Sequence, residues 1–198
     1  GDKLYIKSAS YASSATTLAN GTLGTADLLY NLRLSSVKSL FTIFGGTSAN
    51  SLNKLFDSYD PTSSNGDLSY SIGGLQYPSR PVSTLLSKSG AFLELKQAIG
   101  GAHSSSTNNF SITQGEFGVV GNAVTTVRIP AKFYFGINTE KLSTSTSLLT
   151  GISTQDAPIG LRINLGTATQ QNHNVAVIAL YDALIEVDTV MRSASVKN

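Results

Sequence analysis

Two stretches in the last third of the chain, TTVRIPAKFYFGI at residues 125–137 and VAVIALYDALIEV at residues 175–187, decide the fold. In the first, apolar and polar side chains alternate. The apolar set is Val127, Ile129, Ala131, Phe133, Phe135 and Ile137, and the other set is Thr126, Arg128, Pro130, Lys132 and Tyr134. A period of two places the apolar set on the buried face of a β-strand. The second stretch is apolar at both parities as far as Tyr181, which predicts a central strand covered on both sides.

The same pattern predicts further strands at residues 4–8, 28–34, 68–72 and 159–165. The alternation slips near Ser36 and Val37, and residues 40–44 are apolar at both parities, which indicates a bulge or a fully buried strand. A helix over residues 36–44 is the alternative. We expect residues 8–27, which are small and polar, to form a loop or extended edge, and we expect Pro78 and Pro81 to end a strand.

One helix is predicted over residues 84–99. Its apolar side chains Leu85, Phe92, Leu95 and Ile99 fall within one narrow arc of a helical wheel. Ser83 is the predicted N-cap, and the glycines at positions 100 and 101 suit the C-terminal end. About eight strands with turn clusters between them, one inserted helix and no βαβ rhythm predict an all-β, eight-stranded jelly-roll sandwich.

Composition limits the classes of function. Only 13% of the 198 residues are charged, against about 25% in an average soluble domain, and serine and threonine take their place. We infer that much of this low-charge surface meets another protein. The net charge of +2 comes with scattered basic residues, whereas electrostatic binding of nucleic acid needs a clustered footprint. The chain is long enough for a single domain with a sizeable core.

Several features are missing from the sequence. The chain has no cysteine, which excludes disulfides and thiolate metal sites. No apolar run reaches the ~18 residues of a transmembrane helix, and no signal-peptide pattern is present. The sequence opens at Gly1 without an initiator methionine. We therefore expect residues 1–198 to be a single jelly-roll domain within a longer polypeptide.

Candidate chemistry is sparse. His103 and His173, the only histidines, fall in polar segments and are expected to be loop residues on the surface, since a zinc site needs three or four organised ligands. Asp182 and Glu186 share one parity of the last long strand, and we expect them to be solvated. No Gly-x-Ser-x-Gly elbow occurs, and no lysine follows the paired glycines as in a phosphate loop. The sequence predicts no catalytic, cofactor-binding or metal-binding residues, and hence no enzyme.

Four segments carry a resemblance to a family: LRLSSVKSLF at residues 32–41, YPSRPV at 77–82, LTGIST at 149–154 and YDALIEVD at 181–188. Their order resembles the C-terminal jelly roll of double jelly-roll major capsid proteins of virophages and polinton-like viruses. The resemblance implies a trimeric, pseudo-hexameric capsomer and a first jelly roll on the same polypeptide. The chain departs from the family in holding only one jelly roll's length. Without a first jelly roll, a single jelly-roll capsid or penton protein is the better match.

We therefore expect a viral structural protein of the capsid shell, located in the virion and assembled with other capsid subunits. The predicted contact surfaces are residues 8–27, residues 143–158 and the C-terminal tail. The alternative is a jelly-roll module that binds a receptor or carbohydrate through exposed aromatic side chains near Tyr70, Tyr77 or Tyr134. A cupin-like enzyme would share the fold but needs clustered histidine and carboxylate ligands that this sequence lacks.

Overall fold

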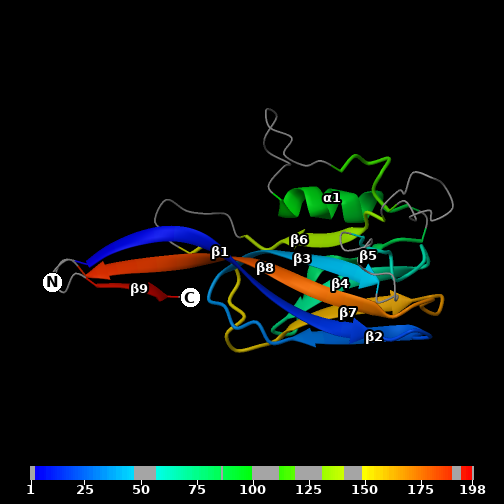
Figure 1. Cartoon of the computed structure of the whole chain (residues 1–198), viewed down its shortest axis with the longest axis horizontal. Coiled ribbons are helices and arrows are strands. Elements are labelled where there is room, and N and C mark those ends of the chain that lie inside the picture. The colour runs from blue at the N-terminus through cyan, green and yellow to red at the C-terminus, as the bar shows by residue number, and fades with distance from the viewer. Residues whose placement is uncertain are drawn as a thin grey trace.

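A computed structural model describes residues 3–46, 57–85, 87–99, 112–118, 131–140, 149–188 and 193–197. Two antiparallel sheets face each other, which confirms the predicted jelly-roll sandwich (Figure 1). The first sheet runs in the order β1 (Lys3–Leu18), β8 (His173–Asp188), β3 (Val37–Gly46) and β6 (Tyr134–Asn138), with β9 (Ser193–Lys197) also paired to β8. The second runs β2 (Gly24–Tyr30), β7 (Ile159–Leu165), β4 (Gly66–Ile72) and β5 (Leu75–Ser83).

The strands with the clearest alternation lie where the sequence places them. β7 covers the predicted residues 159–165, and β8 lies between β1 and β3, which confirms the central strand. Residues 36–44 belong to a strand and not to a helix, and the ladder between β3 and β8 shifts register between Val37 and Ser39, at the predicted slip. Residues 125–130 lie outside the described residues.

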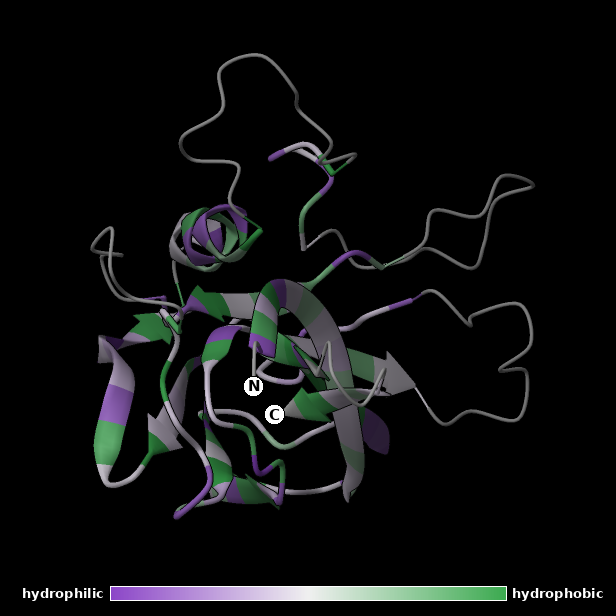
Figure 2. Ribbon diagram, turned by 90° about the vertical axis from the view of Figure 1, so that its left-hand side faces the viewer, coloured by the Kyte–Doolittle hydropathy of each residue, from purple (hydrophilic) through white to green (hydrophobic). Residues whose placement is uncertain are grey.

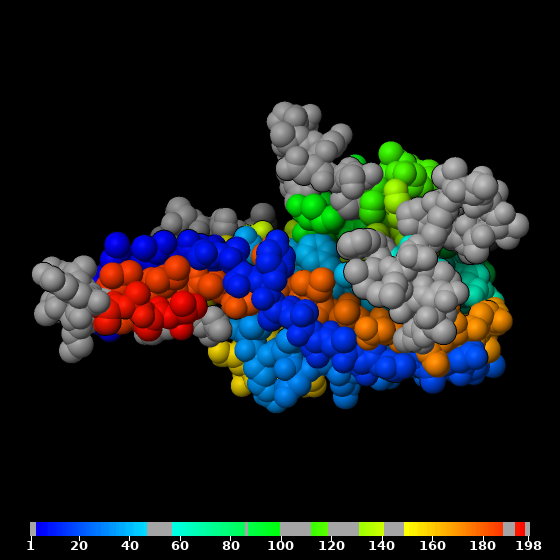
Figure 3. All heavy atoms as spheres, viewed as in Figure 1, coloured from blue at the N-terminus to red at the C-terminus, as the bar shows by residue number. Residues whose placement is uncertain are grey.

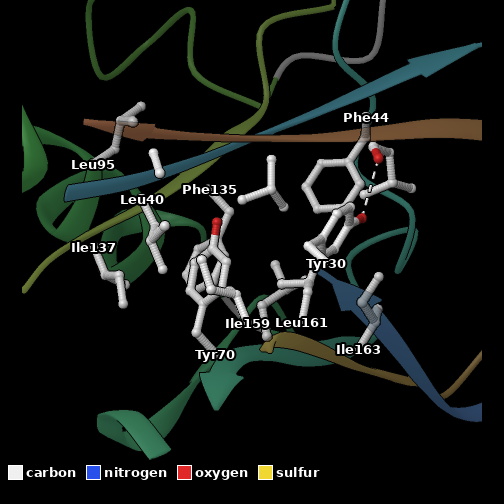
Figure 4. Close-up of a cluster of buried hydrophobic side chains, with 14 of the residues drawn as sticks. Tyr30, Leu40, Phe44, Tyr70, Leu95, Phe135, Ile137, Ile159, Leu161 and Ile163 are labelled. Atoms are coloured by element: carbon white, nitrogen blue, oxygen red, sulfur yellow. Dashed lines mark hydrogen bonds between the residues drawn. The ribbon is translucent and has the colours of Figure 1, made fainter. Parts of the chain in front are cut away.

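The core lies between the two sheets (Figure 4). Tyr70 of β4 stacks on Phe135 of β6, with ring centroids 5.2 Å apart and an interplanar angle of 10°. The Tyr30 hydroxyl donates a hydrogen bond of 3.1 Å to the carbonyl of Val175, so the polar end of a buried ring is satisfied. Ala131, Phe133, Phe135 and Ile137 are all buried, as their shared parity predicts.

For residues 8–27 the extended-edge alternative is confirmed over residues 8–18 and the loop alternative is wrong there, and the prediction that the two prolines end a strand is wrong. β1 runs unbroken to Leu18 and pairs with β8 along its whole length, because small Ser, Thr and Ala side chains suit an edge strand whose outer face is exposed. β5 continues through Pro78 and Pro81. It is the edge strand of its sheet, and its ladder with β4 is interrupted between Tyr77 and Val82, so the missing backbone donors break no ladder hydrogen bond.

The helix α1 (Ser89–Ala98) is shorter than predicted, and Ser83 is not its N-cap. Ser83 belongs to β5, and the next residue, Thr84, is held to the sheet by its backbone N–H, which donates 2.9 Å to the carbonyl of Gly66. The helix buries Ala91, Leu95 and Ala98, while Leu85 lies outside it and is exposed.

The helix covers the outer side of the first sheet, away from the second sheet (Figure 2). Gly136 of β6 allows this close approach, since a Cβ there would lie 3.0 Å from Leu95 Cδ1.

Two leucines on paired strands test this account of the core. Leu161 is fully buried, whereas Leu29 of the adjacent strand is 68% exposed. We expect Leu161→Ala to lower the free energy of unfolding by about 2–5 kcal/mol, because it leaves a cavity between the sheets. Leu29→Ala should change it by less than about 0.5 kcal/mol. Urea unfolding followed by circular dichroism measures both, and equal losses would contradict the assignment of the core.

Candidate subunit interface

Part of the first sheet extends beyond the sandwich. β1 and β8 pair over sixteen residues each, but β3 accompanies β8 only from His173 to Tyr181. Past Tyr181, β9 takes the place of β3. Residues 3–9, 182–188 and 193–197 thus form a three-stranded projection, here called the arm, which leaves the body of the molecule as a single layer (Figures 1 and 3).

One face of the arm is apolar. In an antiparallel ladder, residues directly opposite each other share a face. The opposed pairs on this face are Leu4 with Val187, Ile6 with Ile185, Ser8 with Ala183, and Ile185 with Val196. These positions of β8 have the same parity as Val175, Val177 and Ala179, which are fully buried between the sheets. The apolar face is therefore the core-facing side of the sheet, continued beyond the end of the second sheet.

Ala183 at the base of this face is buried, but the outer part of the face is open to solvent. Leu4 is 54%, Ile6 45% and Val196 63% exposed. A contiguous apolar patch on a single-layer sheet is the usual mark of a protein contact site. The arm is therefore half of a sandwich, and a partner could supply the other half.

The opposite face of the arm carries matched charges. Lys3 pairs with Glu186, and Lys7 Nζ lies 3.3 Å from Asp182 Oδ1. Each lysine of β1 thus meets a carboxylate of β8 across the ladder. The two faces differ in charge, although Tyr5, which is 46% exposed, also lies on the charged face.

Asp182 fixes the base of the arm. Its side chain is buried and accepts hydrogen bonds from the Ser36 hydroxyl, at 2.8 Å, and from the Thr150 backbone N–H, at 3.0 Å. Burial raises the pKa of Asp182, but these two hydrogen bonds and the charge of Lys7 outweigh it and hold the pKa below its ordinary value. Lys38 also approaches, with its Nζ 4.0 Å from Oδ1.

The same cluster holds the segment before β7 against the body. The Gly151 N–H donates 2.8 Å to the Ser36 hydroxyl, and Ile152 and Val37 exchange two backbone hydrogen bonds of 2.8 Å. A Cβ on Gly151 would lie 2.3 Å from the Val37 carbonyl oxygen, so only glycine fits this approach. Residues 149–154 therefore fasten the arm base, whereas residues 143–148 of the predicted contact loop lie outside the described residues.

The predictions for the two carboxylates and for one histidine are wrong. Asp182 and Glu186 are buried and not solvated, since lysines of β1 pair with both. His173 is not a surface loop residue, because it begins β8 and is 3% exposed. His103 lies outside the described residues.

The aromatic side chains named for a carbohydrate site are not presented together on a surface. Tyr70 is fully buried in the core, and Tyr77 and Tyr134 are half-buried. Within the ranges that the structure describes, no group of three or more histidine or acidic residues could hold a metal ion, and no helix is long and apolar enough to cross a membrane.

The interleaved order of strands in two facing sheets defines the chain as a jelly-roll sandwich. No family model matches the chain, and no curated protein matches it in sequence. Solved structures do match, and they confirm that its fold is the jelly-roll fold of viral capsid proteins.

Three of these structures come from viruses and virophages. PBCV-1 VP54, as fitted into a reconstruction of the virophage Sputnik, aligns over 100% of this chain with a TM-score of 0.51 and 9% identity. A chain of the Sputnik virophage structure aligns over 98% with a TM-score of 0.50 and 14% identity. The mavirus major capsid protein aligns over 98% with a TM-score of 0.50 and 8% identity. The alignments cover 51%, 39% and 41% of those chains, so this chain spans about half their length or less.

The arm base makes a prediction about pH. Because the pKa of Asp182 is lower in the folded chain than its ordinary 3.8, its contribution to stability is complete above about pH 5 and is lost as the pH falls through the folded value. We expect Asp182→Asn to remove part of the acid sensitivity and to destabilise the chain at pH 7 by about 1–3 kcal/mol, because the buried hydrogen bonds from Ser36 and Thr150 lose their charged acceptor.

Urea unfolding at pH 7 and pH 3 measures both effects. The control is Asp156→Asn, which changes an exposed carboxylate of the loop before β7. If the two variants lose the same stability between these pH values, the role assigned to Asp182 is incorrect.

Proposed function

We propose that the chain is a structural subunit of a viral capsid shell and that it resides in the virion, where it contacts other capsid subunits and catalyses no reaction. The observation that carries this proposal is the match of nearly the whole chain to the mavirus major capsid protein, at 98% coverage. The arm supports the proposal independently. Its sheet extends beyond the second layer, and the apolar face left uncovered in a monomer can be buried against another subunit in an assembly.

We further propose that a preceding jelly roll of the same polypeptide and a trimeric capsomer complete the assembly, as the resemblance in sequence implies. The lengths favour this arrangement, since one of two jelly rolls would cover about the observed 39% to 51% of the solved chains. The sheet of that first jelly roll is the surface that would cover the apolar face of the arm. Obligate interfaces of this kind bury more than about 2,000 Å² in total.

In the chain of 198 residues the apolar face of the arm is uncovered by any described residue, so we expect copies of this chain to associate through it at micromolar concentration. Ile6→Glu places a charge in the middle of this face and should raise the dissociation constant of the multimer at least about tenfold, since a charge is then buried without a partner. Mass photometry and light scattering measure the multimer.

Leu75→Glu is the matched control. Leu75 is 63% exposed but lies at the turn between β4 and β5, outside the arm. A wild-type chain that stays monomeric at these concentrations would contradict association through the arm, and so would an equal effect of the two substitutions. Co-expression with a preceding jelly roll should protect Ile6 from the solvent, which hydrogen exchange across β1 detects.

A further inference from the structure

β1 leaves the longest unpaired edge among the described strands of the two sheets. Along the body, the edge strands are β1 and β6 in the first sheet and β2 and β5 in the second. Unpaired backbone N–H and C=O groups at an edge can pair with another chain, and proteins usually keep such edges short, covered or interrupted by proline. β2 has seven residues, β6 has five and packs against α1, and β5 contains Pro78 and Pro81. β1 has sixteen residues and no proline.

Charge protects only the arm end of this edge. The charged residues of β1 are Lys3 and Lys7, and lysine on an edge strand discourages pairing. Residues 8–18 contain no charged residue, proline or glycine, and all except Tyr11 and Leu18 are Ser, Ala or Thr. Among the described residues this segment has only β8 as a ladder partner, and β1 lies at the surface along most of its length (Figure 3). The segment 8–18 is therefore an open edge of neutral, mostly small residues.

We infer that residues 8–18 pair antiparallel with the same residues of a second copy of the chain, about a two-fold axis at Ser13. The first sheets of the two copies then join into one continuous sheet. A two-fold contact of this kind is closed, because it uses the open edge of both copies. In this register Tyr11, which is 68% exposed, lies opposite the exposed Ala15 of the other copy, so a large ring faces a small side chain. The ladder makes about ten hydrogen bonds, the number found in a typical specific interface.

The two lysines select this register. An axis at Tyr5 would place Lys3 of each copy opposite Lys7 of the other, and like charges directly opposite each other destabilise a ladder. A parallel pairing in register would set each lysine beside its own counterpart. With the axis at Ser13, both lysines lie beyond the paired segment. The contact is separate from the one proposed for the apolar face of the arm, and it does not depend on the capsid role, because residues 3–7 take no part in it.

Cross-linking tests the inference, because the chain has no cysteine of its own. In the proposed register Ser13 faces Ser13 of the other copy, with Cα atoms about 4.5–5.5 Å apart, within the disulfide range of about 4.4–6.8 Å. We expect Ser13→Cys to form a disulfide-linked dimer under mild oxidation. Thr17→Cys is the matched control, since Thr17 is exposed on the same face but would lie roughly 26 Å from its counterpart. Both variants also carry Ile6→Glu, which weakens association through the arm.

A mixed experiment checks the register. Ala9 and Thr17 are opposed across the proposed two-fold axis, so Ala9→Cys and Thr17→Cys chains should cross-link when they are mixed and not when they are separate. Gel electrophoresis without reductant measures the dimers, and circular dichroism confirms that each variant is folded. Absence of the Ser13→Cys dimer or of the mixed dimer would overturn the inference, as would cross-linking of Thr17→Cys alone to the same extent as Ser13→Cys.

A substitution without cysteine gives a second measurement. Ser13→Lys places two lysines opposite each other at the axis and should raise the dissociation constant of the edge-paired dimer about fivefold. Ser71→Lys, at an exposed position of β4, is the control and should leave that constant unchanged. Light scattering in the Ile6→Glu background measures both, and equal dissociation constants for the two variants would contradict pairing at this edge.

Discussion

The continuous pairing of β1 with β8 is the constraint on which the rest of the structure depends. Sixteen consecutive pairs join the two strands, whereas the paired strands β2 and β7 of the second sheet have seven residues each. One half of the long ladder closes the core, and the other half has no layer opposite it. The arm, its buried base and the open edge of β1 all follow from where this ladder begins, crosses the sandwich and ends.

The strands best predicted from the sequence are those with large apolar side chains that face the core. In β7 and β8, buried side chains recur every second residue, so their position and their place in the sheet could be recognised. The sequence predicts less well the elements whose core-facing side chains are mostly small or polar, because their alternation leaves little trace in hydropathy. Residues 8–18 are small and hydroxylated, and only pairing with β8 shows them to be a strand. Likewise, β5 tolerates Pro78 and Pro81 because it is an edge strand whose ladder with β4 is interrupted there, which local sequence does not reveal.

The polar residues at the arm base illustrate a second limit. Asp182 is buried because Ser36, Thr150 and Lys7 converge on it from three distant parts of the chain. Nothing in the alternation of β8 distinguishes such a carboxylate from one facing water. The resemblance in sequence gave the correct fold, but at identities of 8% to 14% it transfers no individual residue role from the solved capsid structures. Those roles rest on the contacts of this chain.

The arm is one layer thick and the body is two, and this difference has a mechanical consequence. The bending stiffness of a layered structure rises steeply with its thickness. The single-layer arm therefore bends more easily than the two-layer sandwich. The hydrogen bonds from Ser36 and Thr150 to Asp182 fix the position from which the arm bends. Copies of such a subunit could meet at slightly different angles in a curved lattice, with the arm taking up the variation while the core keeps its packing.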